Sequence, residues 1–138
     1  DPPLLQQINS LFSNDSLKFV VHPSARVIKI KTGNSGGIAF AIKNTDTTQG
    51  VFEYSAHASK LDEVCQREFS LEKANDLIIL GGTARNIVLN AGSKMDQAVL
   101  IKFNIPKTTP KCEIEYKIDV KKDNEIYGQM GFKLKIVS

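Results

Sequence analysis

Two histidines, His22 and His57, are the only side chains of this 138-residue chain that could serve as a general base at neutral pH. A nucleophilic site would also need a serine or cysteine held against one of them. His57 stands in the run Ser55-Ala56-His57-Ala58-Ser59, where the serines are sequence neighbours and do not by themselves indicate a triad. The sequence contains no GxSxG, HExxH, phosphate-loop or GxGxxG motif. It therefore predicts a protein that is not an enzyme.

The two cysteines, Cys65 and Cys112, are the next candidates for chemistry. Neither lies in a CxxC pair or near a histidine at metal-ligand spacing, and the aspartates are too scattered to form a calcium loop. We therefore expect no metal and no cofactor. The cysteines predict a structural disulfide formed in an oxidising compartment; two separate buried thiols in a cytosolic domain are the alternative.

The composition is that of one globular domain, with 41% hydrophobic and 24% charged residues. The net charge of +3 is small and its charges are interspersed, so we expect no nucleic-acid partner. No apolar run approaches the roughly 20 residues that cross a bilayer. The chain begins at Asp1 without a signal-peptide pattern, so we expect a processed chain or a piece of a longer one. Asn14 is in the single N-x-S/T sequon, and its glycosylation is left open.

The first segment predicts a short amphipathic helix, with Asp1 as a candidate N-cap and prolines in the first turn. Its apolar residues recur at helical spacing and form the predicted assembly or partner-binding stripe: Leu4, Leu5, Ile8, Leu11 and Phe12. This helix either plugs one end of the domain or is the tail of a longer helix, a severed membrane anchor or an element that packs on a neighbouring subunit. The chain thus divides into a helix and linker, residues 1–16, and a β domain, residues 17–138.

From residue 17 onward the apolar residues alternate with a period of two, which is typical of strands. A break at His22-Pro23-Ser24 suits an edge strand that switches sheets. A crossover over residues 59–76, helix-like at 70–74, carries Cys65. The expected strands are residues 17–21, 25–31, 38–42, 51–57, 77–80, 86–89, 97–105, 112–121 and 126–136. Turns every 8 to 12 residues, roughly, predict an all-β immunoglobulin-like antiparallel Greek-key sandwich of about eight strands, with a barrel as the alternative.

The last two expected strands form a hairpin that turns at residues 122–125. Strict alternation points Tyr116 and Ile126 into the core and leaves Tyr127 as the only tyrosine at an outward position. Because the chain has no tryptophan, a carbohydrate-binding face is not favoured. Lysines at outward strand positions blunt sheet edges against unwanted pairing.

The residues from Asn90 onward resemble the ending of immunoglobulin-like sandwich domains in archaeal and bacterial surface proteins. In those domains an asparagine-x-glycine turn precedes a strand that ends in a proline, and a short loop leads to a strand that carries a tyrosine. Asn90, Gly92, Pro106 and Tyr116 occupy these places. The resemblance makes Tyr116 a tyrosine-corner candidate, whose hydroxyl would bond to upstream backbone. Without a tryptophan, and with Cys65 in an expected loop, the antibody pattern is not met.

A helix followed by such a sandwich is also similar in layout to membrane-anchored archaeal surface components, including pilus and archaellum accessory proteins. The resemblance implies a structural role at the cell surface, outside the cell. Its partner would be a second copy or another surface protein, and the membrane would be met only through a missing N-terminal anchor. The alternative is a monomeric module that binds a glycan or a protein through the loops at residues 33–37, 44–50 and 81–85.

Overall fold

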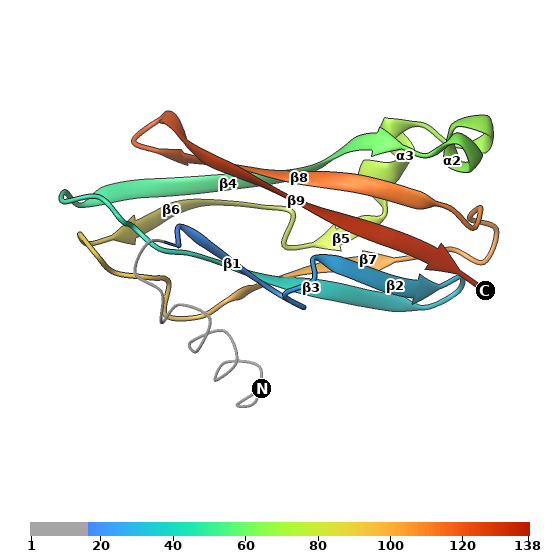
Figure 1. The fold of residues 1–138 in the computed structure, drawn as a ribbon, viewed down its shortest axis with the longest axis horizontal. Coiled ribbons are helices and arrows are strands. Elements are labelled where there is room, and N and C mark those ends of the chain that lie inside the picture. Colours follow the sequence, from blue (N-terminus) through green and yellow to red (C-terminus); the bar gives the residue numbers. More distant parts are fainter. Residues whose placement is uncertain (1–16) are drawn as a thin grey trace.

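The computed structural model describes residues 17–138, which form a sandwich of two β-sheets (Figure 1). The predicted N-terminal helix and its stripe, Leu4, Leu5, Ile8, Leu11 and Phe12, lie outside the described residues. One sheet has the strand order β1-β3-β7-β5 and the other β2-β9-β8-β4-β6. The strands are β1 (Phe19–His22), β2 (Val27–Lys31), β3 (Ser35–Ile42), β4 (Gly50–Leu61), β5 (Ile78–Leu80), β6 (Thr83–Leu89), β7 (Val99–Asn104), β8 (Glu113–Lys122) and β9 (Glu125–Val137).

This strand order confirms the immunoglobulin-like sandwich. In immunoglobulin letters the first sheet reads A-B-E-D and the second contains G-F-C. The predicted switch of sheets also occurs: β1 pairs with β3 in one sheet, and after the break at His22 the chain enters the other sheet as β2. Because the switched strand joins β9 in the same direction, β2 and β9 are parallel, the one departure from an antiparallel fold within residues 17–138.

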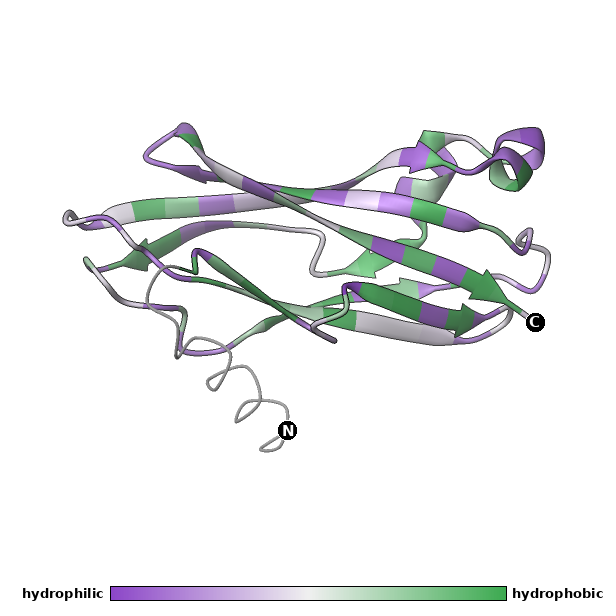
Figure 2. Ribbon diagram, in the orientation of Figure 1, coloured by the Kyte–Doolittle hydropathy of each residue, from purple (hydrophilic) through white to green (hydrophobic). Residues whose placement is uncertain are grey.

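The core lies between the two sheets and is built from the inward side chains of alternating strands. Figure 2 shows the alternation of hydrophilic and hydrophobic residues along β8 and β9. Tyr116 lies at the centre, fully buried, with its ring 5.1 Å from that of Phe103 and stacked at 5.3 Å on that of Phe132. Aromatic pairs of this geometry add to the burial energy.

The crossover between β4 and β5 is helical, which corrects the expected loop around Cys65. Two short helices, α2 (Glu63–Glu68) and α3 (Leu71–Asp76), begin at the N-caps Asp62 and Ser70, whose side chains accept backbone N–H groups. Cys65 is fully buried on α2 and forms the predicted disulfide with Cys112, at a Cα–Cα distance of 5.4 Å. The bridge joins α2 to the residue preceding β8.

A β-bulge in β9 overturns the expected orientations of Ile126 and Tyr127. Val120 pairs with Gly128 but Lys121 pairs with Ile126, so Tyr127 is one extra residue in its strand. The extra residue shifts the side-chain alternation by one position. Tyr127 is therefore buried, 8% exposed, and Ile126 is 89% exposed.

Candidate functional site

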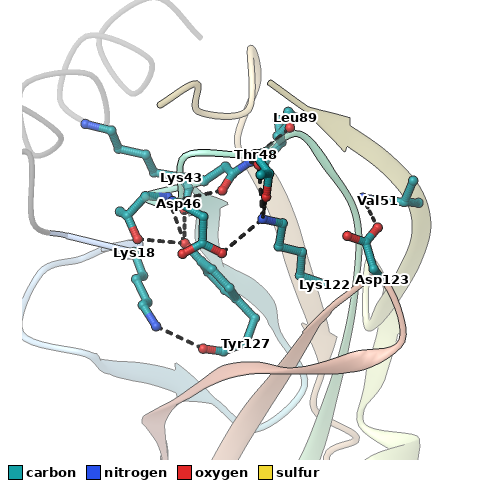
Figure 3. A network of polar contacts seen from close by, with 11 residues as sticks. Lys18, Lys43, Asp46, Thr48, Val51, Leu89, Lys122, Asp123 and Tyr127 are labelled. Atoms are coloured by element: carbon teal, nitrogen blue, oxygen red, sulfur yellow. Dashed lines mark hydrogen bonds and ion pairs between the residues drawn. The ribbon is translucent and has the colours of Figure 1, made fainter. Parts of the chain in front are cut away.

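The most organised polar cluster in residues 17–138 lies at the end of the sandwich where the connection from β3 to β4 meets the β8–β9 turn (Figure 3). Asn44, fully buried, holds this connection. Its Nδ2 donates to the carbonyl oxygens of Thr48 at 2.8 Å and Leu89 at 3.0 Å, and its Oδ1 accepts from the backbone N–H of Asp46 at 3.1 Å. An amide with these partners fixes the loop because each buried polar atom is satisfied.

Tyr127 reaches the same loop from β9. Its hydroxyl donates to the carbonyl of Lys43 at 2.6 Å and accepts from the backbone N–H of Thr45 at 3.0 Å. Lys18 covers the ring, with Nζ 4.5 Å from its centroid and 3.1 Å from the Tyr127 carbonyl oxygen. Phe52 packs edge-on at 4.9 Å. The bulge thus supplies the side chain that ties β9 to the loop.

Lys122 forms the second tie between loop and hairpin. Its Nζ donates to Asp46 Oδ2 at 3.0 Å and to the carbonyl and hydroxyl oxygens of Thr48 at 3.0 and 3.1 Å. The side chain is only 11% exposed. The ammonium therefore has three acceptors, the number of its hydrogens, and is held as a structural charge.

The β8–β9 turn is rigid in its own right. Asp123 and Asn124 both have left-handed backbone, with φ of 50° and 66°, as a two-residue type I′ hairpin requires. Asp123 also bonds with Val51 in both directions, its N–H donating to the Val51 carbonyl at 2.8 Å and its Oδ1 accepting the Val51 N–H at 2.9 Å. The turn is thus fastened to the start of β4.

Above this rigid end the surface carries three exposed aliphatic side chains, which we call the end patch: Val51, Val88 and Ile126, 44%, 57% and 89% exposed. Val51 and Val88 are register partners on β4 and β6. Ile126 lies two strands from Val51, with Lys121 of β8 and its partner Glu53 of β4 between Ile126 and the two valines. A hollow of about 460 Å³ lies beside Val51 and is lined by Glu53, Arg85, Asn86, Asp123 and Asn124 as well. Apolar side chains bordered by polar and charged residues are typical of protein-binding surfaces.

The two histidines lie in different sheets. His57 Nδ1 lies 3.4 Å from Asp119 Oδ2 on the outer face of the five-stranded sheet, and both side chains are about two-fifths exposed, 40% and 45%. Within residues 17–138 no hydrogen bond joins His57 to a serine hydroxyl. His22 ends β1 in the other sheet.

Asp62, Cys65 and Cys112 are grouped closely enough to hold a metal ion. The disulfide occupies both sulfur atoms, however. The Asp62 carboxylate accepts the backbone N–H groups of Cys65 at 2.9 Å and Glu113 at 3.0 Å. This cluster therefore serves as a junction between α2 and β8.

Tyr116 does bond to upstream backbone, but not at the position that defines a tyrosine corner. Its hydroxyl donates at 2.7 Å to the carbonyl of Ala74 in α3, 42 residues earlier, where a tyrosine corner bonds only a few residues upstream. Burial raises the pKa of the Tyr116 hydroxyl far above its usual value. Tyr54, whose hydroxyl donates to Gly81 at 2.6 Å, has its pKa raised by burial to about 12. Both tyrosines are neutral anchors.

The three segments of the predicted ligand-binding module do not converge, and two of them are only partly loops, since residues 35–37 belong to β3 and residues 83–85 to β6. Gly33 bonds to Ile105 at one end of β3, while residues 44–50 follow its other end. The eight residues of β3 separate those ends by about 23 Å. Gly82 lies against Ala56, in the middle of β4. A single site built from all three loops is therefore ruled out.

Sequence reasoning missed the residues that build the rigid end: Asn44, Asp46, Lys122 and Tyr127. Three of them look like ordinary polar turn or surface residues. The one usable signal was the pair Asp123-Asn124 between two alternating runs, which indicates a tight turn. The position of Tyr127 depends on the bulge, and period-two alternation carries no sign of a bulge.

Comparison with known proteins gives structural neighbours only. No family model and no curated protein matches the chain. A PapD-like domain of human CEP192 is 14% identical, covering 91% of this chain and 88% of that one, with a TM-score of 0.43. The class 5 fimbriae chaperone CfaA is 12% identical, covering 86% and 54%, with a TM-score of 0.41. A family 123 glycoside hydrolase from Clostridium perfringens is 11% identical, covering 82% and 23%, with a TM-score of 0.48. These similarities carry no argument about function.

Proposed function

We propose that this chain is a non-enzymatic protein-interaction domain that works outside the cytoplasm as a component of a cell-surface assembly such as a filament, pilus or envelope complex. The observation that carries the proposal is the end patch. Val51, Val88 and Ile126 expose aliphatic surface at the end of the sandwich that the Lys122 and Tyr127 contacts hold rigid. A rigid apolar surface binds a protein partner at a small cost in conformational entropy.

The disulfide supports a location outside the cytoplasm. Cys65 and Cys112 are both buried and bridged, and bridges of this structural kind persist in oxidising compartments. Within residues 17–138 no helix is long and apolar enough to cross a bilayer.

The arrangement of titratable groups supports a role without catalysis. His57 and Asp119 form an exposed pair on a sheet face, and the two tyrosines with raised pKa, Tyr54 and Tyr116, are bonded to backbone carbonyls inside the fold. Catalytic groups typically have a perturbed pKa and face a cleft that substrate can enter. Here the perturbed groups face the core, where they stabilise the fold.

The stripe at Leu4, Leu5, Ile8, Leu11 and Phe12 stays a predicted second contact surface. We expect this stripe to pack either on its own sandwich or on that of a neighbouring copy.

The test is the mass of the full chain in solution, measured by light scattering over a concentration series without reductant. We expect self-association, and we expect the double substitution Val88→Ser with Ile126→Ser to weaken it. The matched control is Val64→Ser with Leu71→Ser, since these helix residues are each 44% exposed and lie outside the end patch. A chain that remains monomeric at every concentration contradicts self-assembly, and equal effects of the two double variants contradict the role of the end patch.

A further inference from the structure

Strand β3 is apolar on both faces, which is unusual for a strand in a two-layer sandwich. Its residues Ile38 to Ile42 are all buried. Ile38, Phe40 and Ile42 point into the core, so Ala39 and Ala41 lie on the outer face, where they are 3% and 1% exposed. Strands that are buried on both faces read as continuous apolar runs because layers cover them on both sides.

Neighbouring strands extend this outer apolar face. Val20 on β1 is the register partner of Ala41 and is 4% exposed; with Ala39 and Ala41 it forms a cluster separate from the main core. Leu100 on β7 pairs with Ala39 and is 48% exposed. It lies over Gly37, where a Cβ would come within 2.9 Å of Leu100 Cδ1. We call Val20, Gly37, Ala39, Ala41 and Leu100 the small-residue face.

The outer face of the five-stranded sheet is exposed to solvent and provides a comparison. Its outward positions on β8 and β9 include exposed Lys117, Lys121, Gln129 and Lys133. The small-residue face itself is apolar, and it is bordered by two basic side chains, since His22 is the register partner of Ala39 and Lys102 that of Gly37. The difference is one of residue type as well as exposure, so the two outer faces have different surroundings.

The helices of the described chain are not placed to cover the small-residue face. Helix α2 contacts β4 and β8, and α3 contacts β4 and β5. Figure 1 shows both helices beside the end of β4, away from β1 and β3.

We propose that the apolar stripe of residues 1–16 packs in cis on the small-residue face, as a third layer over β1, β3 and β7. The chain connection supports this occupant. Residue 17 follows the segment directly, and β1, which begins at Phe19, is the edge strand of this sheet. Residue 17, which follows the segment, is therefore only three residues from Val20 of the small-residue face.

Length and shape also fit. Twelve residues of helix are about 18 Å long, and the four strands of the sheet span about 14 Å between the outer two. Alanine and glycine side chains leave a shallow surface on which a helix backbone can approach closely, and the larger apolar side chains of the stripe fill the remaining space. Packing in cis leaves the end patch available to a partner. The inference therefore goes beyond the proposed function, and the proposed function can stand even if the packing in cis is refuted.

The test reads the exposure of alanine methyl groups in the full chain. Alanine is labelled with ¹³C at the methyl carbon, and a soluble gadolinium chelate broadens the resonances that solvent reaches. We expect Ala39 and Ala41 to be protected in the wild-type chain and their broadening to rise severalfold in Leu5→Ser with Phe12→Ser. Ala58, which lies in the main core at 5% exposure, reports in the same spectrum that the sandwich stays folded.

The control variant is Gln6→Ser with Gln7→Ser, which changes two residues off the stripe and should leave all methyl groups as in the wild type. Unchanged protection of Ala39 and Ala41 in the stripe variant would overturn the proposal. Protection that disappears on dilution of the wild-type chain would also overturn it, because the cover would then come from a second copy. Protection that is independent of concentration and lost only in the stripe variant supports packing in cis.

Discussion

Replacing Tyr116 by phenylalanine should lower the free energy of unfolding, and this loss should become smaller as the pH rises above 10. The substitution keeps the ring contacts with Phe103 and Phe132 and removes the bond to the Ala74 carbonyl. That carbonyl keeps a second, longer bond from the Leu77 N–H at 3.3 Å, so it is not left wholly unpaired. We expect a loss of about 1–2 kcal/mol in the free energy of unfolding at pH 8.

The cost should shrink as the pH rises, because burial raises the pKa of Tyr116 in the folded state only. Below pH 10 the tyrosine is neutral in both states and its full contribution is present. Above pH 10 the unfolded chain releases the phenolic proton while the folded chain keeps it, which favours unfolding. At pH 11 this lowers the stability of the wild type by about 1.4 kcal/mol. The phenylalanine variant has no such proton to lose.

The assay is urea unfolding of both proteins at pH 8, 9, 10 and 11, followed by far-ultraviolet circular dichroism on fresh samples. The two stabilities should converge by about 1.4 kcal/mol between pH 8 and pH 11. Ile118→Val is the control, since it removes one buried methyl group, costs about 0.5–1.5 kcal/mol and carries no titrating group. A cost of Tyr116→Phe that stays constant over this range would refute the reasoning that the hydroxyl is held neutral inside the fold.

Three further changes test other parts of the structure. Replacing Cys65 and Cys112 by alanine opens a bridge between residues 47 positions apart and should lower the stability by about 4 kcal/mol, measured by urea unfolding against the wild type without reductant; a loss below about 1 kcal/mol would contradict the contribution expected of this loop. Lys122→Met leaves the acceptors on Asp46 and Thr48 without their donor, so Tm should fall and proteolysis between residues 44 and 50 should quicken; unchanged cleavage would show that the loop does not depend on this contact. Asp123→Ala should cost more than Asp123→Gly, because glycine accepts the φ of 50° and alanine does not; equal losses of Tm would assign the whole effect to the lost bond to Val51.

The strands of the two sheets were predictable because the alternation of apolar and polar residues that produces them lies within each short segment. Alternation such as Ile114, Tyr116, Ile118 and Val120 states which side of a strand is buried, and the structure buries all four. The break at His22 likewise indicates the change of sheets, since an interrupted apolar run cannot remain one straight strand.

The parts that were missed depend on contacts between distant segments. The helix at Cys65 is short and has weak periodicity, so only the cap at Asp62 could have indicated it. The bulge at Tyr127 arises because that side chain finds Lys43 and Thr45 across the fold. Neither partner is near it in sequence. A polar residue in a turn reads as solvated unless its tertiary partners are known, which is why the rigid end was not predicted.

The parallel pairing of β2 with β9 has a consequence for how the domain would bear force. These strands lie close to the two ends of the described chain and are aligned from Val27 opposite Lys133 to Lys31 opposite Val137. Tension from the N-terminal side would first act on β1, which is paired with β3 in the other sheet. Once β1 has detached, the tension would pull β2 and β9 in opposite directions along their length, so their backbone bonds would be loaded together in shear instead of being opened one after another. The bridge from Cys65 to Cys112 would also keep the residues between them from extending after rupture. A domain with this strand pairing and this disulfide would resist stretching best along the line that joins its ends.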